Sequence, residues 1–212
     1  MFLAGLFGAA MFLALVMGDW AHFTSLTVPA SRYGCRVARM EDWLPQTPLA
    51  LVMGRFERME VFNLPHGIAR CFYDERRILL RPQYRLFSIR FRTAWPMKVS
   101  IDVEQMGEDT HLMGIKRIPW SSAILTLMWF ALVAAGTVGF AIGFLAQGGL
   151  STLGSILMGL GITGLGLLVL AFGLVTVTLA YRLEDGRLTQ AYQELRQALA
   201  GEPLSSHTSK HQ

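Results

Sequence analysis

Apolar and polar residues divide the chain into two long apolar stretches and a mixed middle. Residues 121–181 carry no acidic, basic or histidine side chain, whereas roughly 20 apolar residues suffice for one membrane-spanning helix. A turn is expected at Gln147-Gly148-Gly149, where a polar amide meets paired glycines. The stretch therefore predicts two helices, 121–146 and 151–180, that form an antiparallel transmembrane hairpin. A buried helical pair in a soluble protein is the alternative interpretation.

Small residues recur along both predicted helices of the hairpin at helical spacing. They are Ala135, Gly139 and Gly143 in the first helix and Ser155, Gly159, Thr163, Gly166 and Gly173 in the second. Helices in lipid associate where small side chains let their backbones approach. We expect Gly143 to lie near Ser155 and Gly139 near Gly159, so that the two helices pack on each other. Binding of a second copy or of a membrane-protein partner along the same seam is the alternative.

Residues 1–18 form an apolar run that ends at Asp19-Trp20. The run is about long enough to span a membrane and lacks the positive n-region of a signal peptide, so we expect an uncleaved anchor rather than a cleaved leader. Three spans place residues 19–120 and 182–212 on one side. Basic residues flank the predicted helix ends on that side, at Arg32, Lys116, Arg117, Arg182 and Arg187. The positive-inside rule then makes that side cytoplasmic, in the cell (inner) membrane.

The middle of the chain predicts a small β domain. Residues 19–48 contain three prolines and no clear period, so we expect an irregular linker there. Residues 49–120 are β-rich, and residues 98–104 alternate apolar and polar side chains most clearly. Further strands are expected at Met53–Phe62, Ile68–Tyr73, Ile78–Arg81, Tyr84–Thr93 and His111–Ile118. The predicted fold has three transmembrane helices, with an antiparallel β-meander, closed as a small barrel or folded as a sandwich, between the first and the second.

Residues 182–212 predict an amphipathic helix followed by a disordered tail. One face of residues 187–200 carries Leu188, Tyr192, Leu195 and Leu199. A helix of about four turns is marginal alone in water, so its apolar face needs a cover. The β domain, the membrane interface or a partner could supply this cover. Because Asp185-Gly186 can bend the chain, we expect this helix to fold back near the membrane surface beside the β domain, with that face inward.

Positive charge is concentrated in the middle of the chain. The net charge is +4, and 15 of the 19 Lys and Arg residues lie between Arg32 and Arg117. The candidate binding residues on the predicted strands are Arg81, Arg85, Arg90, Arg92 and Lys98. Each cation near an anionic leaflet contributes about 1 kcal/mol, so these residues predict binding to an anionic lipid surface or to an acidic protein. Nucleic acid is not expected, because no aromatic-basic module is present.

His66, between proline and glycine on a predicted loop, is the one candidate catalytic residue. Asp74-Glu75 offers carboxylates, but no nucleophile accompanies it at a meaningful spacing. The five histidines are scattered, and Cys35 and Cys71 have no metal-ligand or CxxC spacing. No metal and no cofactor are therefore expected, and cytoplasmic cysteines would be reduced thiols.

Ionisable residues are missing from the predicted hairpin, which limits the functions of the chain. Pumps and proton relays need charged or histidine side chains within the membrane, so autonomous transport is not expected. We expect a non-catalytic integral membrane protein, an accessory or scaffolding subunit whose β domain binds a protein partner or the anionic lipid surface. The alternative is a small enzyme at the membrane interface that acts on lipid or peptide, with His66 and Asp74-Glu75 near the headgroups.

Overall fold

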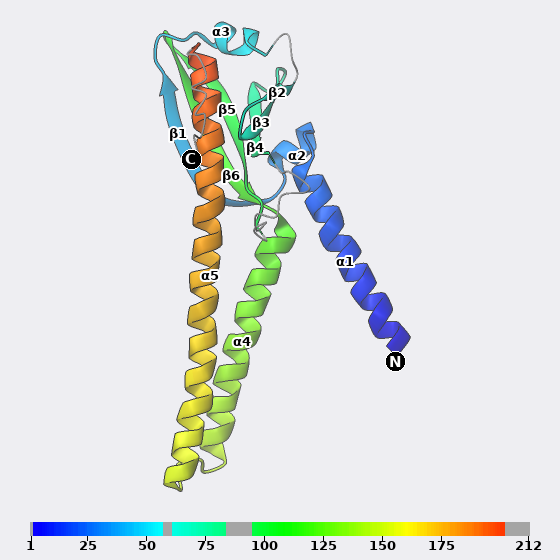
Figure 1. Ribbon diagram of the computed structural model, residues 1–212, viewed down its shortest axis with the longest axis vertical. Coiled ribbons are helices and arrows are strands. Elements are labelled where there is room, and N and C mark those ends of the chain that lie inside the picture. The colour runs from blue at the N-terminus through cyan, green and yellow to red at the C-terminus, as the bar shows by residue number, and fades with distance from the viewer. Residues whose placement is uncertain (1, 57–60, 84–94, 202–212) are drawn as a thin grey trace, which may run out of the picture. The chain divides into compact units, whose positions relative to one another are not determined.

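The structure is a computed structural model that describes residues 2–56, 61–83 and 95–201. The chain forms two compact units (Figure 1). The first unit joins Met1–Trp120 to Leu183–Gln212 and contains the β-sheet, and the second unit, Ser121–Arg182, is a helical hairpin.

Within the described residues of the first unit, six antiparallel strands form one open sheet. They are β1 (Cys35–Leu44), β2 (Val61–Asn63), β3 (Gly67–Phe72), β4 (Arg77–Pro82), β5 (Lys98–Met106) and β6 (Asp109–Ile118). In the order β1-β6-β5-β4-β3-β2, the last five strands in the chain follow one another as a meander, and β1 adds to its β6 side. The predicted meander is confirmed. The predicted barrel or sandwich is wrong, because β1 and β2 are the two edges and do not pair with each other.

One face of the sheet, which we call the core face, is apolar and buried. Its residues pair across the strands as Ile78 with Ile101, Leu80 with Val99, and Val103 with Leu112. The C-terminal part of helix α5 (Leu153–Ala200) covers this face with Leu188, Ala191, Leu195 and Leu199. The approach is close, because a Cβ added to Gly67 of β3 would lie 2.7 Å from the Cβ of Ala191. Figure 1 shows this part of α5 running along the strands.

Helix α5 is 48 residues long and unbroken. The predicted burial of Leu188, Tyr192, Leu195 and Leu199 is confirmed, but the predicted bend at Asp185-Gly186 is wrong. Gly186 lies inside the helix with open space around its Cβ position. A glycine there costs only about 1 kcal/mol relative to alanine, less than the burial of two leucines contributes. The helix stops before Gly201, whose φ of +83° is typical of a glycine that ends a helix.

Residues 19–48 are not an irregular linker. They contain the end of helix α1 (Phe2–Thr24), the short helix α2 (Val28–Arg32) and β1. The hydroxyl of Thr27 accepts a hydrogen bond from the Ala30 N–H and caps α2. Strand β1 lacks a clear sequence pattern because it is an edge strand, exposed along much of its length, and because a bulge between Arg36 and Ala38 interrupts the alternation.

Strand predictions elsewhere are confirmed in part. The strands expected at Ile68–Tyr73, Ile78–Arg81, 98–104 and His111–Ile118 are present within a few residues. The prediction at Met53–Phe62 is wrong at its start, where helix α3 (Leu49–Gly54) ends. Strand β2 lies at its end, and residues 57–60 between them are outside the described part of the chain. An apolar run this short does not distinguish a helix from a strand. The predicted strand Tyr84–Thr93 lies outside the described residues.

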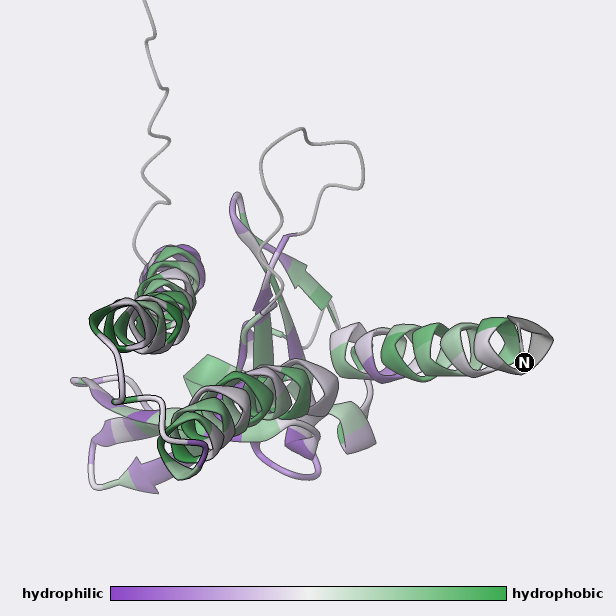
Figure 2. Cartoon of the chain, turned by 90° about the horizontal axis from the view of Figure 1, so that it is seen from below, coloured by the Kyte–Doolittle hydropathy of each residue, from purple (hydrophilic) through white to green (hydrophobic). Residues whose placement is uncertain are grey.

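Three helices in the described chain are long and apolar enough to cross a membrane. They are α1, whose apolar segment is Gly5–Thr24, α4 (Trp120–Ala146) and α5. Figure 2 shows hydrophobic residues along most of α1 and α4, in contrast to the mixed strands. The three predicted apolar helices are present, and α1 continues six residues beyond Gly18, where the predicted anchor ends.

Three glycines of α5 pack against side chains of α4. An added Cβ would lie 2.4 Å from the Phe144 ring at Gly159, 2.2 Å from the Thr137 hydroxyl at Gly166 and 2.4 Å from the Trp129 ring at Gly173. The glycines recur every seven residues, as expected for antiparallel helices that interlock side chains in holes. The expected packing of the two helices on each other is therefore confirmed for Gly159, Gly166 and Gly173.

The predicted register of the hairpin is wrong. Gly159 meets Phe144 rather than Gly139, and both Gly139 and Gly143 have open space at their Cβ positions. A glycine leaves a gap on the helix surface, and here the Phe144 side chain of the other helix fills the gap at Gly159. Of the remaining predicted packing residues, Ala135 is exposed and Ser155 and Thr163 are half-buried. Ser155 exchanges hydrogen bonds with Thr152, each side-chain oxygen accepting from the other's N–H, at the start of α5.

Replacing Gly166 by alanine is expected to destabilise the hairpin, because the added methyl would lie 2.2 Å from the Thr137 hydroxyl. Overpacking of this kind typically costs about 1–3 kcal/mol. Gly139→Ala adds the same methyl where nothing lies within 4 Å, so it should leave stability unchanged or improve it. Thermal unfolding of both variants in detergent measures the difference, and equal midpoints would contradict the seam.

Candidate functional site

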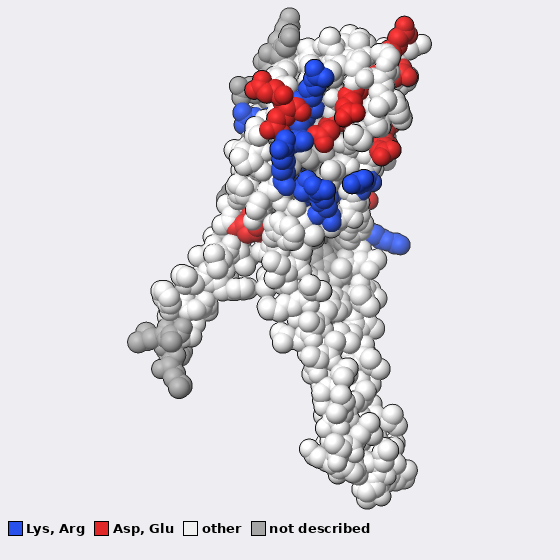
Figure 3. Space-filling view, turned by 180° about the vertical axis from the view of Figure 1, so that it is seen from behind, with Lys and Arg blue, Asp and Glu red and all other residues white. Residues whose placement is uncertain are grey.

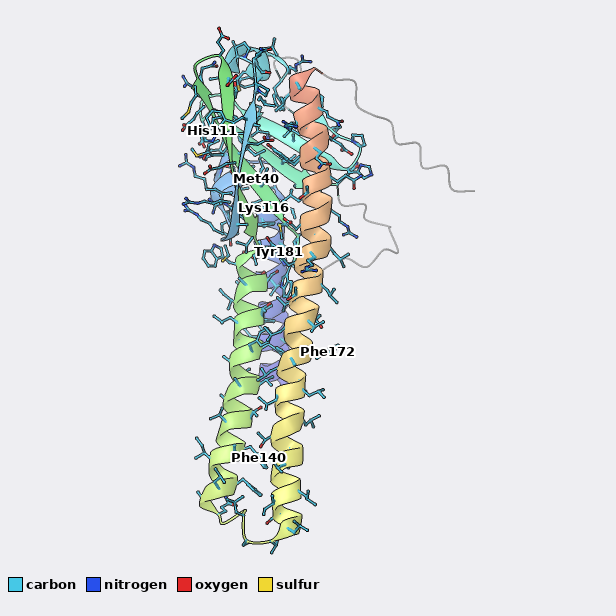
Figure 4. The ribbon with its side chains drawn as sticks, turned by 90° about the vertical axis from the view of Figure 1, so that its left-hand side faces the viewer. Met40, His111, Lys116, Phe140, Phe172 and Tyr181 are labelled. Atoms are coloured by element: carbon cyan, nitrogen blue, oxygen red, sulfur yellow. The ribbon has the colours of Figure 1, made fainter. Side chains whose placement is uncertain are left out.

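A groove lies in the first unit between strands β1 and β6 and the C-terminal part of α5. Its volume is about 430 Å³, and we call it the β1–α5 groove. It is lined by Met40, Asp42, Lys116, Leu188, Thr189, Tyr192, Gln193 and Arg196. Figure 4 labels Met40 and Lys116 on the sheet beside this part of the helix. The Met40 side chain lies across β6, where Gly114 leaves room: a Cβ there would be 2.4 Å from Met40 Cγ.

An ion pair lies toward each end of the groove. Asp42 accepts hydrogen bonds from the Tyr192 hydroxyl at 2.9 Å and from Arg196 Nε at 3.0 Å. Lys116, about four residues away along the strand direction, pairs with Asp185. Burial and the bond to Asp42 raise the pKa of Tyr192 above its usual value, so its hydroxyl remains a donor at neutral pH. The groove therefore combines apolar walls with fixed charges.

His66 lies in the turn between β2 and β3 and binds α5. Its backbone N–H donates to Glu194 Oε2 at 2.9 Å, and its ring Nδ1 contacts Glu194 Oε1. Gln190 Nε2 lies 3.2 Å from the same ring nitrogen. One carboxylate thus holds both the backbone and the ring, an arrangement that fixes a turn against a helix.

The Asp74-Glu75 pair is separate from His66. The two sites stand at opposite ends of β3, whose six residues span roughly 20 Å. Glu75 pairs with Arg77 at 2.8 Å and with Arg32 at 3.2 Å. Glu75 is therefore used in ion pairs elsewhere, and the carboxylate beside His66 is that of Glu194.

Lys98, a predicted surface cation, is buried and only 1% exposed. Its Nζ donates to the carbonyl oxygens of Phe23 at 2.8 Å and Ala30 at 2.6 Å, and it lies 3.9 Å from the centre of the Phe23 ring. Burial, followed by the nearby charges of Arg117 and Arg81, lowers the pKa of Lys98 from 10.5 to about 7. The interpretation of Lys98 as a lipid-facing residue is wrong, because residues 23–30 cover the start of β5.

Basic side chains attach the segment 23–34 to the second face of the sheet. Arg70 Nη1 donates to the Leu26 carbonyl at 2.6 Å, and Arg117 Nη1 donates to the Gly34 carbonyl at 3.2 Å. Lys98 serves the same purpose at the end of α1, where helix carbonyls lack helical partners and favour a cation. These residues therefore connect α1 and α2 to the sheet.

Of the other predicted binding residues, only Arg81 lies in the part of the chain that the structure describes. Arg81 is half-buried on β4, and Arg85, Arg90 and Arg92 lie outside the described residues. In Figure 3 the Lys and Arg side chains gather over the part that carries the sheet and are interspersed with Asp and Glu. Charges of both signs therefore lie on this face. Within the sheet, Arg77 of β4 pairs with Asp102 of β5 at 2.6 Å.

The two cysteines are free thiols in different environments. Cys35 is half-buried at the start of β1, and Cys71 is buried on the core face. Burial raises the pKa of the Cys71 thiol to about 11, so it is neutral and unreactive at physiological pH. In the described residues, no group of three or more His, Cys, Asp or Glu side chains is placed to hold a metal ion.

Comparison with protein-family models, curated proteins and solved structures finds no match to this chain. The function therefore has to be inferred from the geometry of the chain itself.

Sequence reasoning missed the β1–α5 groove, because its residues come from three distant segments. The amphipathic pattern of 187–200 identifies the helix that forms one wall. It predicts that Leu188 and Tyr192 are buried, but it does not predict which residues they contact. Asp42 lies in a segment expected to be irregular, so its bond to Tyr192 had no sequence signal.

The stability of the first unit is expected to rise between pH 7 and 8.5. The pKa of Lys98 is about 7 when folded and near 10.5 when unfolded, so the unfolded chain binds more protons in this window. The slope is then at most about 1.4 kcal/mol per pH unit. Lys98→Met should abolish it, as measured by denaturant unfolding in detergent. The window ends below pH 9. Above that pH the Cys71 thiol loses its proton in the unfolded chain before it does so in the folded chain, and this lowers the stability as the pH rises. Parallel pH profiles for the two proteins would contradict the role of Lys98.

Proposed function

We propose that the chain is a non-catalytic integral membrane protein, an accessory or scaffolding subunit that presents a β domain to a protein partner. The observation that carries the proposal is helix α5. Its first part is apolar enough to span a membrane, and its last part covers the core face of the sheet without a break between them. A sheet whose cover belongs to its own membrane helix cannot be released from its anchor, which suits a scaffold.

A protein partner is favoured over the lipid surface as the ligand of the β domain. Lys98 is buried, and Arg77 and Arg32 are engaged with carboxylates of the same domain. Arg36 and Arg39 are exposed and take part in no ion pair among the described residues, but the acidic Glu41 is exposed beside them on β1. Attraction to anionic lipid needs several unpaired cations near the surface. A groove with apolar walls and fixed charges instead offers the shape and the polar contacts that a protein ligand requires.

The alternative, an enzyme at the membrane interface, is supported by one observation, the contact of His66 with Glu194. A histidine beside a carboxylate can act as a general base. However, the hydrogen bonds of this ring go to Glu194 and Gln190, both on the helix that His66 helps to hold. His66→Gln should therefore loosen the tail of α5. Loss of an interfacial hydrolase activity with unchanged proteolysis of α5 would favour the enzyme instead.

Mild-detergent purification of the tagged full-length chain from native membranes tests the proposed function. A partner should co-purify in fixed stoichiometry, and a variant with Leu195→Asp, which places a charge in the core-face contact, should lose it. Ala200→Asp, at an exposed position of the same helix outside the β1–α5 groove, serves as the control and should retain the partner. A wild-type chain that always elutes alone, in detergent and in anionic nanodiscs, would refute the proposal.

The β domain and the C-terminus are proposed to face the cytoplasm of the cell (inner) membrane, because the hairpin turn is uncharged and basic residues flank the other helix ends. In a chain with Cys35→Ser, a cysteine at Gln147 should react with an impermeant maleimide added to intact cells. A cysteine at exposed Arg76 should react only after lysis. Reaction of the second variant in intact cells would reverse the orientation.

A further inference from the structure

The free edge of β1 borders the β1–α5 groove. Among the described strands, β1 pairs with β6 on one side and with no strand on the other. Strand β1 has ten residues, whereas β2 at the opposite edge has three. The N–H and C=O groups along a free edge can accept an additional strand. The longer edge is therefore the better template.

The hydrogen-bonding pattern shows which backbone groups of β1 face outward. The Trp43 N–H donates to Asp42 Oδ1 at 2.8 Å and so does not bond β6. Because N–H direction alternates along a strand, the N–H groups of Glu41 and Arg39 point to the same free edge. The bulge at Val37 ends the regular stretch on one side, and Asp42 occupies the Trp43 N–H on the other. The available edge is thus a short stretch, residues 38–41.

The charge along this edge is unbalanced. Arg36, Arg39 and Glu41 are exposed, and none of the three takes part in an ion pair among the described residues, whereas Arg196 is bound to Asp42. The two guanidinium groups outnumber the one free carboxylate, so the edge keeps an excess of positive charge. Acidic side chains on an added strand would lie beside these two guanidinium groups. The edge therefore selects for an acidic segment.

The groove supplies the second element of recognition. A strand added to β1 directs every second side chain toward one face of the sheet, and on the α5 side that face is lined by Met40, Leu188 and Tyr192. Apolar side chains of the added strand would contact these three residues. Main-chain hydrogen bonds and a side-chain groove together are the basis of strand-addition binding.

We propose that residues 38–41 of β1, with the β1–α5 groove, bind an extended segment of a partner protein in which acidic and apolar residues alternate. The inference rests on the proposed function and names the surface that the partner would occupy. The chain's own residues 202–212 are a poor occupant, because they contain one acidic residue beside one lysine and two histidines.

Fluorescence anisotropy of a labelled hexapeptide of alternating valine and glutamate, added to the full chain in nanodiscs, tests the proposal. Saturable binding is expected, weakened at least tenfold by Arg39→Glu and unchanged by Arg76→Glu, the same charge reversal at an exposed turn. Glu41→Pro removes an outward N–H and should abolish binding. Amide hydrogen exchange at Arg39 and Glu41 should slow in the complex, a readout that remains if the proline variant does not fold.

Several results would overturn the proposal. A matched peptide of alternating valine and lysine that binds equally well would remove the charge argument, and unchanged amide exchange would remove the added strand. A dimer that Arg39→Glu dissociates would identify a second copy as the occupant. Binding that appears only after removal of residues 202–212 would identify the tail. A partner that co-purifies equally with Arg39→Glu would exclude this edge and leave the accessory role intact.

Discussion

The burial of one helix face against one sheet face is the interaction on which the β domain depends. An open sheet of six strands has an apolar face that nothing in its own strands can cover. Leu188, Leu195 and Leu199 of α5 cover it and are at most 2% exposed. At about 2 kcal/mol for each buried leucine, these three residues contribute an amount comparable to the whole net stability of a small domain. The sheet and the end of α5 therefore form one folding unit.

The two faces of the sheet are covered by different chemistry. The core face is closed by aliphatic packing, whereas the second face is closed by cations that bind backbone carbonyls of residues 23–34. Lys98 is the extreme case, a buried amine between the carbonyl oxygens of Phe23 and Ala30. Removal of a charge from water is costly unless hydrogen bonds replace the lost solvation. These bonds are directional, so they also fix where α1 ends relative to the strands.

Local patterns predicted those elements whose environment is uniform along their length. The apolar stretches, the alternating residues 98–104 and the amphipathic residues 187–200 all correspond to elements of the structure. The prediction missed strand β1, because an edge strand with a bulge has no single buried face. The prediction of Lys98 as an exposed cation was wrong, because its burial depends on a segment about 70 residues away. The sequence singled out His66 but not its partner Glu194, which lies 128 residues further along the chain. These misses share a dependence on contacts between distant parts of the chain.

The position of the sheet's cover at the end of the sequence has a consequence for biosynthesis. Strand β6 ends at Ile118, and the helix face that covers the sheet is complete only at Leu199. At translation rates of about 5–20 residues per second, the apolar core face waits roughly 4–16 s before its cover emerges. During this interval the hairpin is being made, and the unfinished sheet exposes both its core face and its free edges. We therefore expect a chaperone or the insertion machinery to shield the apolar face of the nascent sheet until the last helix is in place.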